Sequence, residues 1–415
     1  MLSDVNAVTA AARQAVAETP ITDVHTHLFP PSHGDLLLWG ADEVLTYHYL
    51  VAELFTIAPR ELTPEKFWRL SKAAQADLVW EHVFVRHGAL SEAARGCVTV
   101  FNALGLDVAG RDLAGIRKWF AEQDVDEHLA RVFDLAGLDC AVMTNNPFLA
   151  VEAGFWDAAA PRPDCLKAAL RIDPLLVGWD AAVAGLAEQG YDVAADGSGK
   201  TMDEVRRFLV DWSKKIDPVY FAASLGPDFA YPAASVQTEV INHAVMPAAE
   251  EVGVPFAMMI GVRKGVNPAL GDGGDGVGVA DVASVMHLCQ RFGDAKFLVT
   301  MLSRVNQHEL AVLARKFGNL HLFGCWWFCN TPSIIEEMTR QRLELLGATF
   351  TCQHSDARVL DQLIYKWPHT RKIVADVLAD KYADLFNAGW RPTAEEIARD
   401  ARALFGGSFA EFLAK

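Results

Sequence analysis

The sequence has neither an excess of positive charge nor a long hydrophobic run. Its 415 residues include 37 Lys and Arg against 53 Asp and Glu, for a formal net charge of −16. Nucleic acids are bound through an excess of basic residues, so we expect no nucleic-acid partner. Apolar runs such as Pro255 to Val262 reach about half of the ~20 residues that a membrane helix requires, so we expect no membrane partner. A small anionic substrate remains compatible with this charge where arginines converge locally.

The seven cysteines show no Cys-x-x-Cys spacing, and several of them fall inside apolar runs. We therefore expect reduced, buried thiols and no structural zinc site. The first twenty residues carry an early acidic residue and no unbroken apolar stretch, which predicts a helix rather than a secretory signal. These features together predict a cytoplasmic protein. The cysteines are Cys97, Cys140, Cys165, Cys289, Cys325, Cys329 and Cys352.

Hydrophobic residues make up 51% of the chain, enough to bury a large core. From about residue 139, short apolar runs alternate with longer amphipathic stretches, which is the pattern of strand, crossover helix and parallel strand. Runs such as FAMMIG and FLVTML are apolar throughout, as expected for parallel strands buried on both faces. The predicted strands are Ile21 to Val24, Asp139 to Met143, Leu166 to Ile172, Pro218 to Ser224, Pro255 to Ile260, Lys296 to Leu302, Leu320 to Trp326 and Ala348 to Cys352.

Eight such units predict an α/β fold of the (β/α)8 TIM-barrel type, which needs ~250 residues before insertions are counted. Helical patterns without a convincing strand run from Pro30 to about Lys118. We expect a helical insertion there, after strand one, that covers the barrel mouth. The chain is thus divided into residues 1–29, the insertion at 30–118, and the remainder of the barrel with C-terminal helices at 119–415. The tail after Lys366 is predicted to be helical and to pack outside the barrel.

The strongest local pattern is His25-Thr26-His27 at the end of strand one, where residues two apart project to the same side. Strand eight lies beside strand one in a closed barrel, and Asp356 follows strand eight. These three side chains would form a His, His, Asp site with open positions for one divalent metal ion, Zn²⁺ first and Mn²⁺ second. Two alternatives stay open: a hydrogen-bonded histidine pair, and Asp356 as the N-cap of the following helix.

Arginines follow several of the predicted strands. Arg171 ends strand three, and Arg358 stands two residues after Asp356. The planar guanidinium suits carboxylate recognition, so we expect these two to bind a carboxylate-bearing substrate. Arg263 and Arg304, after strands five and six, are weaker candidates. A surface arginine or a simple ion pair is the alternative for each.

Tyr47-His48-Tyr49 lies on the first insertion helix, where consecutive residues point about 100° apart, so only part of the triplet can face the site. We predict that His48 holds or moves a proton and that Tyr49 assists it, with packing as the alternative. Trp326 is expected to line the pocket. The loop from Gly271 to Gly276 matches G-x-G-x-x-G, but its two aspartates would repel phosphate and no strand of its own leads into it. It is interpreted as a turn at the barrel mouth.

The chain resembles the uronate isomerases of the amidohydrolase superfamily, in particular a divergent bacterial branch, over nearly its whole length. The segments that carry this resemblance are TDVHTHLFPP, LLLWGADEVLTYHYLVAE, ALRIDPLL, PFAMMIGV, NPALGDGGD, KFLVTMLSRVNQHELAVLARKFG, FGCWWF and QHSDARVLDQLIYKW.

The resemblance implies a distorted eight-stranded barrel that interconverts glucuronate with fructuronate, or galacturonate with tagaturonate. It implies that His25, His27 and Asp356 bind the metal. It also implies that His48, Tyr49, Arg171 and Arg358 contact substrate or transfer protons. The expected partner is a small anionic sugar acid, and a homo-oligomer is compatible with the family.

Two other functions stay open from sequence. A mononuclear metal-dependent hydrolase or decarboxylase could use the same scaffold. Hydrolytic amidohydrolases usually add histidines after strands five and six, where this chain has none, so a hydrolase is disfavoured. A sugar-acid binding protein without catalysis is the third alternative, which the complete set of metal and proton-transfer residues makes the least favoured.

Overall fold

Seven parallel strands form the centre of the computed structural model, which describes residues 1–415. Neighbouring strands pair in the order β1-β2-β3-β4-β5-β8-β9, which confirms the predicted α/β fold. Each strand is buried along most of its length, as its apolar sequence predicts. The strands are β1 (Ile21–Thr26), β2 (Leu138–Asn145), β3 (Leu166–Arg171), β4 (Pro218–Leu225), β5 (Phe256–Ile260), β8 (Phe297–Met301) and β9 (Leu320–Leu322). The short strands β6 (Val262–Arg263) and β7 (Gly276–Val277) form a separate antiparallel hairpin.

The prediction of a regular eighth strand at Ala348 to Cys352 is wrong. This segment makes only an isolated parallel bridge between Phe323 and Thr351. The amide of Cys352 donates to the carbonyl of Leu404 in the C-terminal region (3.0 Å), so it is not available to a neighbouring strand. The eighth position of the barrel is therefore an irregular segment, which accounts for the distorted shape.

The irregular segment still closes the barrel at the carboxyl ends of the strands. The amide of Asp356 donates to the carbonyl of His25 (3.1 Å), and the amide of His27 donates to the carbonyl of Ala357 (2.8 Å). These two bonds fix the segment against the end of β1. Strand one and the irregular segment in the place of strand eight are thus neighbours at the site, as expected.

Strand β9 is shorter than the predicted Leu320 to Trp326, because the chain turns at Gly324. This glycine has φ of 70°, a left-handed conformation that side-chain-bearing residues rarely adopt. A Cβ atom there would also lie 1.9 Å from Cδ2 of His354. The turn sends Trp326 and Trp327 toward the barrel mouth instead of continuing the sheet.

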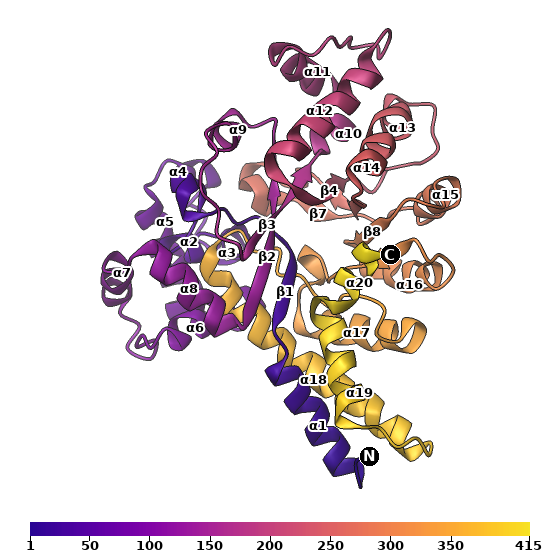
Figure 1. Ribbon diagram of the computed structural model, residues 1–415. Coiled ribbons are helices and arrows are strands. Elements are labelled where there is room, and N and C mark those ends of the chain that lie inside the picture. Colours follow the sequence, from indigo (N-terminus) through magenta and orange to yellow (C-terminus); the bar gives the residue numbers. More distant parts are fainter.

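Helices surround the sheet and extend from it (Figure 1). The helices that follow strands β2 to β9 include α12 and α17, whose amphipathic sequences had predicted them. These helices are α9 (Ala150–Asp157), α10 (Asp173–Val177), α11 (Trp179–Glu188), α12 (Thr201–Ile216), α13 (Val236–Val240), α14 (Met246–Val252), α15 (Ala283–Arg291), α16 (Gln307–Ala314) and α17 (Pro332–Leu346). None of the helices is both long and apolar enough to span a membrane. All seven cysteines are free.

A group of helices separates β1 from β2 and lies on one side of the sheet in Figure 1. The expected boundary at residue 118 falls inside α7, and the helices continue to α8 directly before β2. Helix α3, the second helix of this group, lies at the barrel mouth. The helices are α2 (Ala41–Leu45), α3 (His48–Ile57), α4 (Pro64–Trp68), α5 (Lys72–Val79), α6 (Glu92–Ala103), α7 (Leu113–Ala121) and α8 (Val125–Ala136).

The C-terminal tail is helical but does not lie wholly outside the barrel, which corrects the prediction. Helices α18 (Leu363–Asn387) and α19 (Ala394–Arg402) pack on α1 (Val5–Glu18). The last helix, α20 (Ser408–Ala414), instead brings Phe409 and Phe412 into the apolar cluster that fills the barrel interior. The C-terminal helix thus plugs the amino-terminal end of the barrel, opposite the site described next.

Candidate active site

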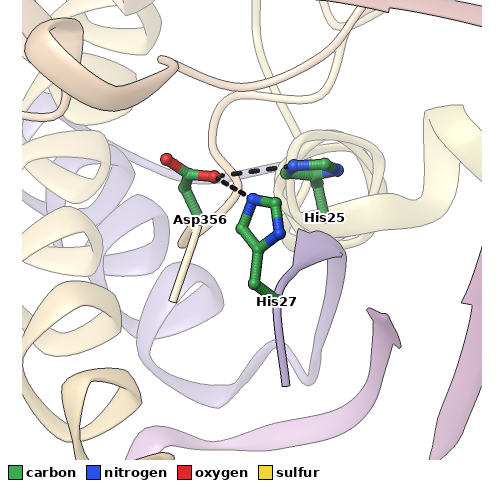
Figure 2. A group of neighbouring side chains, drawn as sticks. All are labelled: His25, His27 and Asp356. Carbon is green, nitrogen blue, oxygen red and sulfur yellow. Dashed lines mark ion pairs between the residues drawn. The ribbon is translucent and has the colours of Figure 1, made fainter. Parts of the chain in front are cut away.

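His25, His27 and Asp356 meet at the carboxyl end of the barrel (Figure 2). Nε2 of His27 lies 3.2 Å from Oδ1 of Asp356, and Nε2 of His25 lies 3.5 Å from the same oxygen. His25 is fully buried, Asp356 is 5% exposed, and His27 faces the cavity described below. The spacing of the two histidines and the closure of the barrel had predicted this juxtaposition.

The three residues fit a divalent metal ion. Nε2 of His25 and Oδ1 of Asp356 are both buried and have no hydrogen-bond partner. Buried polar atoms are rarely left in that state, and a metal ion would satisfy both. Ligand atoms on a tetrahedral ion with bonds of ~2.0–2.2 Å lie roughly 3.3–3.6 Å apart, close to the two separations observed. Imidazole and carboxylate together suit Zn²⁺ and Mn²⁺.

Asp356 is held in a left-handed backbone conformation, with φ of 53°. Such conformations cost energy outside glycine, although Asp tolerates them better than most residues, and they concentrate at functional sites. The alternative role of Asp356 as a helix N-cap is wrong, because the long helix α18 begins only at Leu363. The turn at Asp356 serves instead to aim its carboxylate at the two histidines.

A cavity of about 840 Å³ opens above these ligands. Its volume is within the range of small-molecule binding sites. It is lined by residues from the ends of the strands and from the insertion. Lining residues predicted as site residues are His27, His48, Arg171, Trp326, Asp356 and Arg358. The structure therefore brings together six of the predicted residues around one cavity.

Arg171 and Arg358 both face the cavity and are both held by carboxylates. Arg171 donates from Nε and Nη2 to the two carboxylate oxygens of Asp173, at 2.8 and 3.2 Å. Arg358 donates to Asp272 at 2.5 Å. Asp272 belongs to the 3-10 helix η4 (Pro268–Gly274), the segment that resembled a dinucleotide loop. The glycine-rich loop therefore positions an arginine at the cavity.

The other two arginines differ. Arg263 lies on β6 and lines the cavity without a carboxylate partner. Arg304 pairs with the exposed Glu337 at 2.8 Å and does not line the cavity. Arg171, Arg304 and Arg358 thus all form ion pairs, but Arg304 is the one whose ion pair lies on the surface away from the cavity.

The Tyr47-His48-Tyr49 triplet is divided between two cavities. Tyr47 and His48 line the main cavity, whereas Tyr49 lines a neighbouring one of about 270 Å³ that shares His48 and Trp327 with it. Tyr47 is the N-cap of α3, and the helix turns Tyr49 away from it. Tyr47 was not among the predicted site residues, because helical spacing shows that part of the triplet faces the site without showing which part.

The proton-bearing groups of the triplet are neutral. Burial lowers the pKa of His48 to about 3, and the positive charge of Arg358 acts in the same direction. Its Nε2 is buried without a partner. Burial and the nearby carboxylate of Asp356 raise the pKa of Tyr47. These shifts leave both groups uncharged at neutral pH.

One solved structure resembles this chain over its entire length. A crystal structure of a uronate isomerase from Bacillus halodurans is 48% identical in sequence, with a TM-score of 0.97. The alignment covers 100% of this chain and 98% of the other. The chain belongs to the uronate isomerase family. No protein-family model matches the chain, and no curated protein matches it.

Two more distant structures share the uronate isomerase fold. A uronate isomerase from Thermotoga maritima is 17% identical with a TM-score of 0.76, over 99% of this chain and 98% of the other. A glucuronate isomerase from Caulobacter crescentus is 17% identical with a TM-score of 0.74, over 98% and 94% of the two chains. At this identity the likeness concerns the fold alone. These two structures thus share the barrel fold with this chain.

Proposed function

We propose that this protein interconverts the aldose and ketose forms of hexuronates, D-glucuronate with D-fructuronate, D-galacturonate with D-tagaturonate, or both. The observation that carries the proposal is the full-length, 48% identical match to a uronate isomerase. It is supported by a cavity that combines a metal-ligand set with arginines suited to a carboxylate. Isomerisation moves a proton from carbon two to carbon one through an enediol, so the substrate needs a free aldehyde or ketone.

Arg171 is the proposed ligand of the substrate's carboxylate, and Arg358 is the proposed ligand of the oxygens of the enediol. Asp173 uses two of the five N–H donors of Arg171, and the others remain free to bind a carboxylate. Arg358 lies two residues from Asp356, where its charge stabilises oxyanion character on the enediol. Trp326 forms an apolar wall of the cavity against which the sugar can pack.

His25, His27 and Asp356 are the proposed ligands of one divalent ion, with Zn²⁺ preferred and Mn²⁺ as the second choice. When bound, such an ion polarises the carbonyl and hydroxyl oxygens of the substrate as a Lewis acid. The chain itself supplies the rest of the chemistry. His25 is fully buried and His27 only partly exposed, so bulk water is largely excluded from this side of the site.

His48 and Tyr49 are the proposed proton-transfer residues, together with Asp356. The neutral Nε2 of His48 can exchange a proton with a sugar hydroxyl during ring opening, because it is otherwise without a partner. The hydroxyl of Tyr49 is likewise buried without a partner, on the far side of His48 from the main cavity. We assign to Tyr49 a part in the exchange at carbon two that acts through the adjacent Tyr47, whose ring centroid lies 4.9 Å from that of Tyr49 and whose side chain lines the main cavity.

The alternative of a hydrolase or decarboxylase is not favoured. The ends of β5 and β8, which correspond to predicted strands five and six, carry Ile260 and Met301 rather than histidine. The match to a uronate isomerase also favours isomerisation. We retain isomerisation as the single proposed reaction.

Proton NMR of metal-supplemented protein with D-glucuronate and D-galacturonate in separate tubes tests the proposal. We expect the ketose to appear with the total of aldose and ketose conserved. In D₂O, the carbon that accepts the proton should acquire deuterium. Absence of turnover with both sugars, with Zn²⁺ or Mn²⁺ present, would contradict the proposed function.

Asp356→Asn is the matched variant for this experiment. The amide keeps the size of the side chain but removes the negative charge that the metal site requires. We expect the variant to fold and to lose turnover. Near-normal turnover in a folded variant would contradict the assignment of Asp356.

A further inference from the structure

We propose that Tyr220 and Thr144 are positioning residues that fix the tautomer of His25 and His27, so that both Nε2 lone pairs face the metal site. This inference rests on the proposed metal site and not on the identity of the sugar. Neutral imidazole carries one N–H, and only the other nitrogen can bind a metal. The hydrogen bonds of the two Nδ1 atoms decide which nitrogen that is.

Tyr220, on β4, lies between His25 and the backbone of β1. Its hydroxyl oxygen is 2.8 Å from the carbonyl oxygen of Val24 and 3.1 Å from Nδ1 of His25. The hydroxyl has one proton, and a carbonyl oxygen can only accept. If that proton pointed at Nδ1, two oxygens would face each other at 2.8 Å with no hydrogen between them. Tyr220 therefore donates to Val24 and accepts from Nδ1–H of His25.

Thr144, on β2, makes the same arrangement with His27. Its hydroxyl oxygen is 3.0 Å from the carbonyl oxygen of Thr26 and 2.9 Å from Nδ1 of His27. By the same count of protons, Thr144 donates to Thr26 and accepts from Nδ1–H of His27. Each histidine thus donates from Nδ1–H to a hydroxyl oxygen. That hydroxyl donates its own proton to the backbone carbonyl of the residue immediately before the histidine.

Burial makes these hydrogen bonds decisive. Tyr220 and His25 are 0% exposed and Thr144 is 4% exposed, so water cannot readily replace either hydroxyl. With Nδ1 protonated in both rings, two lone pairs face Oδ1 of Asp356 at 3.2 and 3.5 Å. Electron pairs at that separation repel unless a cation lies among them. The two hydroxyls therefore prepare the site for a metal ion before one binds.

The tautomers can be observed directly in metal-free protein by long-range ¹H–¹⁵N NMR of ¹⁵N-histidine-labelled chain. We expect His25 and His27 to show the Nδ1–H pattern in the wild type. Tyr220→Phe and Thr144→Val remove only the accepting hydroxyl, so each should change the pattern of its own histidine. An Nε2–H pattern for these residues in the wild type would overturn the inference.

Zinc affinity, measured by competition with a chelator, gives the second readout. Loss of such an orienting partner typically weakens metal binding ~10–100-fold, and we expect this from each variant. Thr300→Val is the control for Thr144→Val, because the Thr300 hydroxyl is buried in β8 without a partner. Tyr382→Phe is the control for Tyr220→Phe, because it removes a buried phenol that donates to Asp400 at 2.7 Å, outside the site. Both controls should bind zinc like the wild type.

The possible outcomes separate this inference from the proposed function. Wild-type affinity in folded Tyr220→Phe and Thr144→Val overturns the positioning role. Absence of zinc binding in the wild type overturns the metal site and this inference together. Intact zinc binding and the expected tautomers in a protein that leaves both uronates unchanged support this inference and overturn only the proposed substrate.

Discussion

Tyr47 and Tyr49 are two positions apart, yet only Tyr47 lines the main cavity. Burial raises the pKa of its phenol, so the hydroxyl keeps its proton at neutral pH and can donate it to a sugar oxygen in the cavity. We expect Tyr47→Phe to lower kcat/KM by about 2- to 10-fold, since a neutral hydrogen bond contributes ~0.5–1.5 kcal/mol. Steady-state kinetics with each uronate measures this.

Tyr49→Phe is the comparison for that variant. A phenol that transfers the carbon-two proton should lower kcat more than KM, whereas a phenol that only binds substrate changes both. Equal and small effects of the two substitutions would contradict the division of roles between the two cavities.

Asp173 is expected to matter as much for binding as the arginine that it holds. Its carboxylate accepts two hydrogen bonds from Arg171 and one from the amide of Ser224 at 3.0 Å. Asp173→Asn removes the charge and one acceptor, so Arg171 loses its fixed orientation. Hydrogen bonds to charged groups contribute ~1.5–3 kcal/mol, so KM should rise about 10- to 100-fold with a smaller change in kcat.

Arg304→Gln is the control for Asp173→Asn. Arg304 is exposed and pairs with Glu337 outside the cavity. Surface ion pairs contribute little, so its kinetics should match the wild type. An unchanged KM in Asp173→Asn would show that Arg171 does not bind the substrate's carboxylate.

At the scale of elements, Glu152 joins α9 to the end of β2. One of its oxygens accepts from the side-chain amide of Asn145 (3.0 Å) and from the backbone amide of Asn146 (2.8 Å). It is 2% exposed, and burial raises the pKa of its carboxyl to about 7 from the usual value of 4.5. The native state therefore holds this proton at pH values where the unfolded chain has released it.

That proton gives a prediction for stability against pH. Between about pH 4.5 and 7 the native state binds more protons than the unfolded state at this site, so the free energy of unfolding falls as pH rises. Above pH 7 the contribution is constant. Glu152→Gln keeps the accepting oxygen without the titration. Relative to the wild type, it should gain on the order of 3 kcal/mol between pH 4.5 and 8, at ~1.4 kcal/mol for each pKa unit.

Urea unfolding of both proteins at the two pH values measures the difference. The substitution also alters packing, but that effect on the free energy of unfolding is the same at both pH values. Only the change of the difference with pH therefore reports the titration of Glu152. A difference between variant and wild type that stays the same at pH 4.5 and 8 would contradict the raised pKa of Glu152.

Most strands were predictable because each is a locally complete pattern, an apolar run between amphipathic stretches. The segment Ala348 to Cys352 has the same composition, yet the amide of Cys352 pairs with Leu404, more than fifty positions away along the chain. No local pattern carries that pairing. For the same reason the two phenylalanines of α20, Phe409 and Phe412, gave no sign that they fill the barrel interior.

The site residues also divide into those that the sequence predicts and those that it does not. His25, His27 and Asp356 were predictable together because period-two spacing and barrel closure fix where all three side chains point. Tyr220 and Thr144 were not, because an apolar strand shows no difference between a hydroxyl that packs and one that orients a histidine. Whether Tyr47 faces the main cavity depended on the direction of one helix turn, so it could not be predicted. Position along a strand is thus readable from sequence, while the partner of a polar atom is not.

At the scale of the whole molecule, the metal ligands join the first strand to the segment that closes the barrel. His25 lies in β1 and His27 directly follows it, whereas Asp356 belongs to the irregular segment that replaces strand eight. Only two backbone hydrogen bonds connect these parts at the carboxyl end, at 2.8 and 3.1 Å. A metal ion bound by all three residues would therefore tie the closure together, and the unfolded chain has no such site.

This arrangement predicts that metal stabilises the fold and that the stabilisation grows with the logarithm of the metal concentration above Kd. Binding to the native state alone adds RT ln(1 + [L]/Kd), which is ~2.7 kcal/mol at a hundredfold excess over Kd. We expect Tm to rise with added Zn²⁺, to fall after chelation, and to remain unchanged by Zn²⁺ in Asp356→Asn. Differential scanning calorimetry at several metal concentrations measures this. The same rise in Asp356→Asn would place the stabilising ion elsewhere, and the closure of the barrel would then depend on its hydrogen bonds, which include those of the Asp23 carboxylate with the Ser355 amide and with Trp367.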